Sequence, residues 1–158
     1  MQTEQTEPVS QTETTPIAPI PIDEEMVVYL VVNTDLGMGA GKTAAQVGHA
    51  VQYLMMKREE TLALLDYAMA FGNEEHTKHV KQAFDFNKWH NSDSITKIVL
   101  AASAKDFGKV QTEYEGRCVV VKDAGRTEIA SGSETVIGLY PMTKASVSKT
   151  IRRLRLLK

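Results

Sequence analysis

Two short polar segments contain residue types that could carry out hydrolytic or anion-binding chemistry. The first extends from Asn33 to Ala50 and has a glycine-rich stretch before Lys42, and the second extends from Asp123 to Ile129. Each follows an apolar run, Val27 to Val32 in one case and Cys118 to Val121 in the other. Open α/β sheets bind ligands where their strands end. We therefore expect the two segments to contribute to one site.

The residues after the glycine-rich stretch are predicted to form a helix from Gly41 to about Glu60. At 3.6 residues per turn, one stripe of this helix carries four side chains: Lys42, Gln46, His49 and Tyr53. The unpaired N–H groups at the helix N-terminus would suit a phosphate or an oxyanion beside Lys42. A structural interpretation stays open, in which Lys42 is solvated and His49 is a hydrogen-bonded core residue. For His49 taken alone, we favour that interpretation.

The second segment also has two interpretations. Asp123 could orient or activate a water molecule. It could instead bond backbone N–H groups in a turn where Gly125 supplies a positive φ. The following residues, Ser131, Gly132 and Ser133, are predicted to form the turn into the last long strand.

A nucleotide-binding P-loop is an alternative for the first segment, because Gly41-Lys42-Thr43 lies between a predicted strand and a predicted helix. The spacing argues against it. The P-loop pattern requires glycine at position 36, where this chain has Leu36, and Gly37 comes one residue late. The P-loop stays as an alternative interpretation.

Charge is unevenly distributed along the 158 residues, a length that fits about one domain. Six of the 20 acidic residues precede Met26, and all 18 Lys and Arg residues follow it. Residues 1–25 are predicted to be a disordered acidic leader. The remaining 14 acidic and 18 basic residues give a small positive excess that permits an RNA partner.

The single cysteine, Cys118, excludes an internal disulfide and is expected to be a buried thiol. The leader lacks the features of a secretory signal, and no apolar run approaches the ~20 residues that span a bilayer. We therefore expect a cytoplasmic protein.

Apolar periodicity predicts four strands connected by helices, which is typical of an α/β sandwich. The strands are predicted at Met26 to Val32, Ile95 to Ala102, Cys118 to Val121 and Glu134 to Tyr140. The helices after the first are predicted at Thr61 to Phe71, Thr77 to about Trp89, Ser103 to Tyr114 and Lys144 to Leu157.

The two polar segments together resemble the type II peptidyl-tRNA hydrolase family. The stretch from Tyr29 to Ala50 carries the resemblance, with Asp123-Ala-Gly-Arg-Thr-Glu-Ile and the following Gly-Ser-Glu-Thr-Val, in the family's order. The resemblance extends from about residue 26 to the C-terminus. It implies a compact three-layer α/β sandwich with a mixed four-stranded sheet and helices on both faces.

The resemblance also implies an ester hydrolase that separates a peptide from the 3'-terminal ribose of tRNA and so recycles tRNA. It implies peptidyl-tRNA as partner, no cofactor and no metal, and a homodimer, since members often dimerise. The family's functional residues fall on Lys42, Gln46, His49, Asp123 and Thr127. As a hypothesis, Asp123 with His49 orients or deprotonates the water and Thr127 positions it. Lys42 stabilises the oxyanion or a terminal tRNA phosphate.

The sequence departs from the family's usual pattern at two places. Ser131 stands where the family usually has proline, and residues 55–94 are longer than usual and are predicted to hold a helical insert. Its histidines and aromatic residues are His76, His79, His90, Phe84, Phe86 and Trp89. Metal binding and base stacking are alternative roles for these residues, but two histidines three apart make a poor zinc site. We expect the aromatic residues to fasten the insert to the body.

The predicted closing helix is basic, with Val147, Ile151 and Leu154 as its buried stripe. A solvated surface would explain its charges equally well. In a tRNA-binding protein they would contact phosphates. The predicted tRNA contacts are Lys42, Arg126, Lys149, Arg152 and Arg153. A noncatalytic tRNA-binding or adaptor protein is the remaining alternative, and the retained Lys42, Asp123 and Thr127 favour the enzyme.

Overall fold

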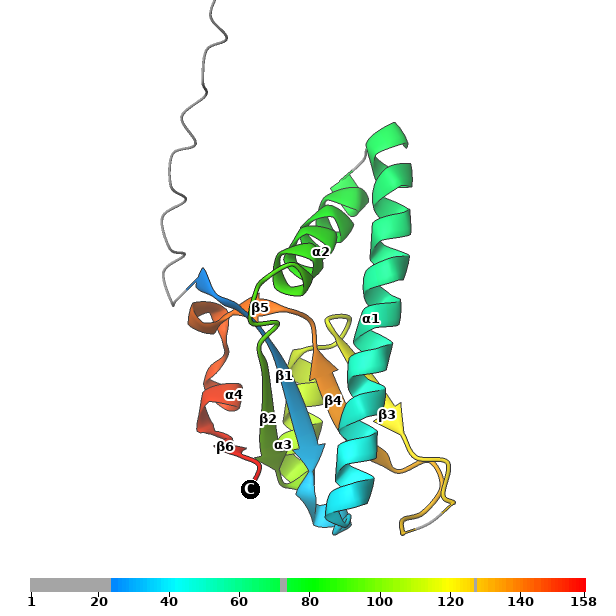
Figure 1. Cartoon of the computed structure of the whole chain (residues 1–158), viewed down its shortest axis with the longest axis vertical. Coiled ribbons are helices and arrows are strands. Elements are labelled where there is room, and N and C mark those ends of the chain that lie inside the picture. The colour runs from blue at the N-terminus through cyan, green and yellow to red at the C-terminus, as the bar shows by residue number, and fades with distance from the viewer. Residues whose placement is uncertain (1–23, 72–73, 127) are drawn as a thin grey trace, which may run out of the picture.

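The computed structural model describes residues 24–71, 74–126 and 128–158 (Figure 1). For residues 66–71 and 74–77 it describes the helical backbone alone. All but Glu24 and Glu25 of the predicted leader lie outside these ranges, so its predicted disorder stays a prediction. None of the helices within the described ranges is both long and apolar enough to span a membrane.

The predicted mixed sheet is confirmed. Its long strands are β1 (Met26–Asn33), β2 (Lys97–Ala102), β3 (Cys118–Lys122) and β4 (Glu134–Leu139), in the order β3-β4-β1-β2. β1 pairs parallel with β2 and antiparallel with β4, and β4 pairs antiparallel with β3. The carboxyl ends of β1, β2 and β3 therefore lie at one edge of the sheet (Figure 1).

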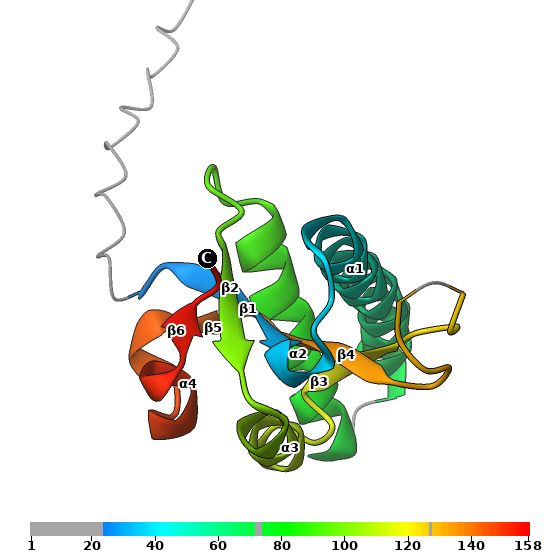
Figure 2. The ribbon, with the colours of Figure 1, turned by 90° about the horizontal axis from the view of Figure 1, so that it is seen from below.

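Helices cover both faces of this sheet, as the three-layer prediction requires (Figure 2). All eight residues of β1 are buried, and the first seven alternate between two cores. Val27 and Val31 pack in the core beneath α3 (Ala104–Glu113). Val28 and Leu30 pack in the core beneath α1 (Ala40–Phe71) and α2 (Glu74–His90). These two helices form the helical hairpin.

The predicted boundary between helices at Glu60 and Thr61 is wrong, because α1 continues through it to Phe71. The charged residues there do not end the helix, since Lys57 pairs with Glu60 across 2.6 Å on its surface. Thr61 is buried and its hydroxyl donates to the Lys57 carbonyl at 2.7 Å, one turn back. No glycine or proline interrupts this stretch.

The predicted closing helix from Lys144 to Leu157 is also wrong. A 3-10 turn, η3 (Lys144–Ser146), precedes a five-residue helix, α4 (Lys149–Arg153), and the chain then forms β6 (Arg155–Leu156). β6 pairs with β2, and the Leu157 N–H donates to the Val99 carbonyl at 3.0 Å. The backbone groups of these last residues therefore form hydrogen bonds with the open edge of β2 in place of the hydrogen bonds of a longer helix. A second short strand, β5 (Met142–Thr143), pairs with β1.

The aromatic residues of the predicted insert mostly do fasten it to the sheet. Phe86 and Trp89 are buried, and the Trp89 indole N–H donates to the Thr96 carbonyl at 2.9 Å. The Phe86 ring lies 5.0 Å from that of Tyr140. Phe84 is the exception, with 66% of its surface exposed. Whether residues 55–94 are an insertion relative to the family stays a prediction.

Candidate active site

Asp123 follows β3 at the edge where three strands end, and its carboxylate is the centre of a polar cluster. Its Oδ1 lies 2.5 Å from Lys42 Nζ and accepts a hydrogen bond from Gln46 Nε2 at 3.0 Å. Its Oδ2 accepts from the Gly125 N–H at 2.8 Å. Asp123 is 6% exposed. The structure thus brings together three of the predicted residues: Lys42, Gln46 and Asp123.

Helix α1 aims two of these side chains. Lys42 and Gln46 lie about one turn apart, so both point from the same face of α1 toward the end of β3. The Gln46 amide is held by Thr135 of β4, whose hydroxyl donates to Gln46 Oε1 at 2.8 Å. Gln46 Nε2 therefore faces Asp123. Thr135 is completely buried. No sequence pattern indicates this role of Thr135, because threonine is common in strands.

The Lys42 ammonium is the main cause that holds the pKa of Asp123 below its ordinary value of 3.8. The Gly125 N–H and the Gln46 amide lower the pKa further, and burial opposes them. The carboxylate is therefore ionised at neutral pH and is a weak base. Of its roughly four acceptor positions, three are used by described donors, which leaves one for a water molecule.

The loop after Asp123 is closed by backbone hydrogen bonds. The Asp123 N–H donates to the Ser133 carbonyl at 2.9 Å, and the Gly132 N–H donates to the Asp123 carbonyl at 2.7 Å. Gly125 has a φ of +72°, and a Cβ there would lie 2.6 Å from the Ser131 backbone. The structural interpretation of this segment is therefore confirmed. The same turn holds the carboxylate that pairs with Lys42, and the functional interpretation stays a prediction. Ser131 and Gly132 form the predicted turn.

The N-terminus of α1 is partly occupied by the chain itself. The Gly39 N–H, directly before the helix, donates to Glu128 Oε2 at 2.7 Å. A carboxylate therefore lies where a free phosphate was expected to bind. The preceding residues form a 3-10 turn, η2 (Thr34–Leu36). The carboxylate and the pairing of Lys42 with Asp123 both oppose the P-loop alternative.

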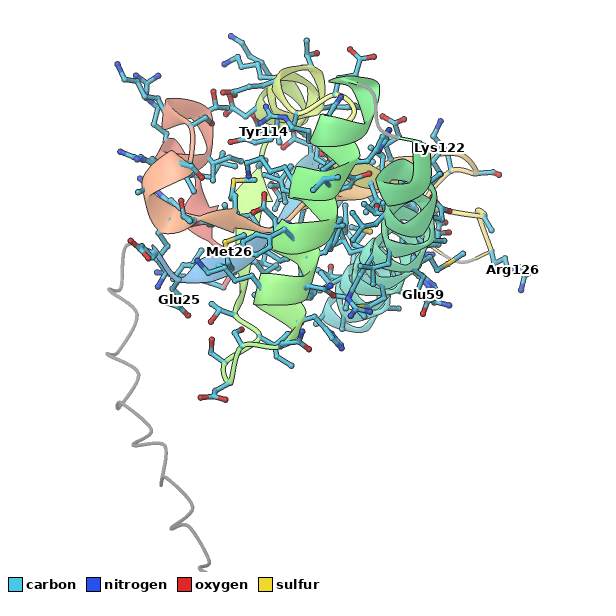
Figure 3. The ribbon with its side chains drawn as sticks, turned by 90° about the horizontal axis from the view of Figure 1, so that it is seen from above. Glu25, Met26, Glu59, Tyr114, Lys122 and Arg126 are labelled. Atoms are coloured by element: carbon cyan, nitrogen blue, oxygen red, sulfur yellow. The ribbon has the colours of Figure 1, made fainter. Side chains whose placement is uncertain are left out.

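The remaining predicted site residues are not in this cluster. His49 is exposed and makes no hydrogen bond to the described residues, so its interpretation as a core histidine is wrong. Thr127 lies outside the described residues. Arg126 is exposed on the loop after β3, and its side chain points away from the body (Figure 3).

The other predicted tRNA contacts, Lys149, Arg152 and Arg153, are exposed on α4. This helix lies beside β6, at the opposite end of the strand order from β3 (Figure 2). Cys118 is partly buried rather than fully buried, and burial raises the pKa of its thiol. The described residues include no group of three or more His, Cys, Asp or Glu side chains arranged to hold a metal ion.

Comparison with known proteins gives consistent matches. Residues 26–157 match the family model described as peptidyl-tRNA hydrolase PTH2. The chain is 34% identical over 133 residues to the probable peptidyl-tRNA hydrolase 2 of Schizosaccharomyces pombe. The aligned residues cover 82% of this chain and 55% of that protein. It is 33% identical over 136 residues to the human protein named peptidyl-tRNA hydrolase 2, mitochondrial. That alignment covers 84% of this chain and 64% of the human protein.

A peptidyl-tRNA hydrolase of Methanococcus maripaludis is 28% identical over 131 residues, which cover 81% of this chain and 96% of that protein. The chain thus spans between about half and two thirds of the length of the yeast and human relatives, and nearly all of the Methanococcus protein.

Proposed function

The chain belongs to the type II peptidyl-tRNA hydrolase family, and we propose that it hydrolyses the ester between a peptide and the 3'-terminal ribose of tRNA. This activity would recycle tRNA from prematurely released peptidyl-tRNA. The observation that carries the proposal is the buried Asp123 carboxylate bound by Lys42 and Gln46 at the end of β3. Ester hydrolysis requires an oriented water molecule and positive charge where the oxyanion develops. The cluster supplies an acceptor for such a water, Asp123, and a positive charge, Lys42, in direct contact with each other.

In the proposed reaction, the water oxygen bonds to the carbonyl carbon and the bond from that carbon to the ribose 3'-oxygen breaks. The water gives up a proton, and a proton ends on the ribose oxygen. Asp123 Oδ2 has an acceptor position left to orient the water. Because its pKa is lowered, we assign Asp123 to orientation rather than to storage of the proton. Thr127 stays the residue predicted to position the water. With Asp123 assigned to orientation, we assign acceptance of the proton to His49, the residue predicted to act with it, which is exposed on α1.

Lys42 is assigned to the oxyanion. Its ammonium lies in the first turn of α1, where the helix dipole adds positive potential. It is 12% exposed, so water screens it less than a surface lysine. A single electrostatic donor of this kind is worth about 10²–10³ in kcat.

The test is incubation of the purified chain with N-acetyl-leucyl-tRNA, without added nucleotide. We expect release of acetyl-leucine, and we expect Asp123→Asn to release it at least about 100-fold more slowly. Asp106→Asn is a matched control, because Asp106 also pairs with a lysine, Lys109 at 2.9 Å, but lies on α3. It should retain the parental rate. Free leucyl-tRNA, which lacks the acyl group on its nitrogen, checks specificity for peptidyl esters.

Other outcomes would select the alternatives. Binding of tRNA without release would favour the noncatalytic adaptor protein. Release that depended on a nucleotide and magnesium would favour the P-loop interpretation. An Asp123→Asn variant that matched the parent would remove Asp123 from the proposed mechanism.

Cellular location and assembly belong to the proposal as well. We propose that the protein is cytoplasmic and that it forms a homodimer. Both proposals rest on the sequence analysis. The human and bovine relatives carry the word mitochondrial in their names, so fractionation of cells should include mitochondria. Sedimentation velocity of the purified chain tests the dimer.

A further inference from the structure

The chain covers one edge of its sheet and leaves the other edge open. At the β2 edge, β6 pairs with β2, and the Leu157 N–H donates to the Val99 carbonyl at 3.0 Å. At the other end of the strand order, β3 pairs with β4, and no second strand within the described ranges lies beside it (Figure 1). This open edge is the one that leads directly into Asp123.

The backbone groups on the open edge follow from the pairing of β3 with β4. The Tyr140 N–H donates to the Arg117 carbonyl at 3.0 Å, so these two residues form a hydrogen-bonded pair directly before β3. Such pairs recur at every second residue of an antiparallel ladder. Val119 therefore bonds toward β4, whereas the N–H and C=O groups of Cys118 and Val120 point toward the open edge. The edge thus offers donors and acceptors to a further strand.

The open edge of β3 has little of the protection that edge strands usually carry. Natural proteins protect such edges with charged residues, prolines, bulges or covering segments. In β3, the one charged residue, Lys122, and the bulge between Val121 and Lys122 lie at the end of the strand. The first three residues, Cys118 to Val120, are apolar and partly exposed. They are therefore available to pair with an added strand.

Helix α1 adds an exposed apolar surface beside this edge. α1 runs antiparallel to β3 from Gln46, which donates to Asp123 (Figure 1). Tyr53 lies two turns further, about 10 Å along the helix axis. The distance from Asp123 back to Val120 along β3 is also about 10 Å, so Tyr53 lies level with Val120. Tyr53 and Met56 continue the stripe of Gln46 and are 40% and 51% exposed.

We propose that the open edge of β3 binds the peptide of peptidyl-tRNA as an added strand, with Tyr53 and Met56 against its side chains. The inference rests on the proposed function and names the site for the peptide part of its substrate. The ester lies at the carboxyl end of the peptide, and Asp123 follows the carboxyl end of β3. The peptide therefore runs parallel to β3, and its last carbonyl reaches the Asp123 cluster.

Two features of the edge favour a peptide as its occupant. Prematurely released peptides differ in sequence, and a strand edge binds main-chain groups, which every peptide carries. Met56 has an adaptable side chain, which suits contact with varied residues. β3 has five residues, so about five residues of the peptide can pair with it.

The first experiment tests main-chain pairing on the substrate. Acetyl-pentaalanyl-tRNA is compared with acetyl-alanyl-tRNA, and with versions of the longer substrate in which one amide nitrogen at a time carries a methyl group. For the parent we expect the longer substrate to have a kcat/KM about 25-fold higher, mainly through KM, from two added hydrogen bonds of about fivefold each. Methylation should lower kcat/KM at alternate positions, because every second N–H of an added strand faces β3. No effect of length, or an equal loss at every position, would overturn the proposal.

The second experiment removes a donor from the edge. Val120→Pro deletes the N–H that points toward the open edge, and proline is tolerated on edge strands at such positions. Val120→Ala is the matched control, since it shortens the side chain and keeps the N–H. We expect the ratio of kcat/KM between the long and the short substrate to fall about fivefold in Val120→Pro and to be retained in Val120→Ala. This ratio is internal to each protein, so a partly unfolded variant does not distort it. The same ratio in the parent and both variants would contradict the peptide site.

Sedimentation velocity of the same three proteins tests a competing occupant, a second copy of this chain. If the parent is a dimer that Val120→Pro dissociates, while the substrate ratio is unchanged, the edge belongs to the dimer and the peptide site is overturned. A substrate ratio that falls in Val120→Pro without a change of assembly supports the peptide site.

The two proposals can fail separately. Affinity for amide-linked analogues, in which nitrogen replaces the ribose 3'-oxygen, is measured without hydrolysis. Tighter binding of the longer analogue, without hydrolysis of any ester, would overturn the proposed function and support the peptide site. Hydrolysis without an effect of peptide length would support the proposed function and overturn the peptide site.

Discussion

At the scale of single residues, Lys42 determines the protonation state of Asp123. The carboxylate is buried, which by itself would raise its pKa, and the ammonium reverses that effect. Gln46 adds a neutral donor whose direction is set by Thr135. The Asp123 carboxylate is therefore held charged at a position from which most water is excluded. Such a position strengthens the electrostatic effect of a charged group on a substrate.

Substitution of Lys42 by methionine tests this dependence. Lys42→Met removes the largest cause that lowers the pKa of Asp123 and leaves burial, which raises it. We therefore expect the pKa of Asp123 to rise, so that protonation begins at a higher pH than in the parent. Carbon-13 NMR titration of the Asp123 carboxyl measures this directly. Lys57→Met is the control, because Lys57 pairs with Glu60 elsewhere on α1. An unchanged pKa in Lys42→Met would assign the effect to Gly125 and Gln46 alone.

At the scale of elements, the helical hairpin of α1 and α2 is bound to the sheet by a few large side chains. Phe86 is completely buried between α2 and the sheet core, while Phe84, two residues earlier, is mostly exposed. The hairpin therefore contributes to the core over β1, and that core also supports the first turns of α1. A substitution that loosens the packing of α2 should therefore also displace the first turns of α1, which carry Lys42 and Gln46.

Alanine substitutions of these two phenylalanines form a matched pair. We expect Phe86→Ala to lower the free energy of unfolding by about 3–5 kcal/mol, because it leaves a cavity in the core. Phe84→Ala should change it by less than about 0.5 kcal/mol. Urea denaturation followed by circular dichroism measures both. Equal effects would mean that the hairpin is not held through Phe86.

A second element-scale contact joins the start of β1 to its neighbours. Glu25 pairs with Lys144 of η3 at 2.7 Å and accepts hydrogen bonds from the hydroxyls of Thr96 and Ser94. These donors, Lys144 foremost, lower the pKa of Glu25 to about 2. The residue before β1 is thereby linked to segments that precede β2 and follow β5.

The lowered pKa of Glu25 predicts a pH-dependent contribution to stability. A carboxylate with a depressed folded-state pKa stabilises the fold above its unfolded pKa, and this contribution is lost as the pH falls toward the folded value. We expect Glu25→Gln to lower Tm at pH 6, and the difference from the parent to shrink between about pH 4.5 and pH 2. The neighbouring exposed Glu24, changed to Gln, is the control. A difference in Tm that stayed constant down to pH 2 would contradict the assignment.

Across the whole molecule, the predicted tRNA contacts divide into two groups. Lys42 pairs with Asp123 and Arg126 lies on the loop that follows Asp123, whereas Lys149, Arg152 and Arg153 lie on α4, beside β6 at the other end of the strand order. A footprint that includes both groups must extend across the full width of the sheet. Because tRNA is long and carries a phosphate at every nucleotide, it can contact both groups at once.

The salt dependence of tRNA binding tests how far the footprint extends. Each phosphate contact adds about 1 to the slope of log K against log salt, so Arg126→Ala should reduce the slope by about 1. The double change Arg152→Ala and Arg153→Ala should reduce it by about 2 if α4 takes part. Lys109→Ala on α3, where Lys109 pairs with Asp106, is the control. An unchanged slope in the double variant would exclude these two arginines from the footprint.

The sequence by itself determined those features that depend on local spacing. Short apolar runs located β1 to β4, and the 3.6-residue period placed Lys42 and Gln46 on one face of α1. The two polar segments, read together, also indicated the family that residues 26–157 match.

Only the tertiary structure decided the contacts between segments far apart in the chain. Thr135 holds Gln46 across 89 positions, Glu128 reaches Gly39 across 89, and Asn33 reaches Glu134 across 101. The end of the chain became β6 because β2 offered an open edge, although its own sequence favours a helix. The exposure of His49 also depends on the tertiary structure. Periodicity gives the direction of a side chain from its helix but not whether another segment covers it. Such contacts depend on how the sheet and helices pack, and no local pattern encodes that packing.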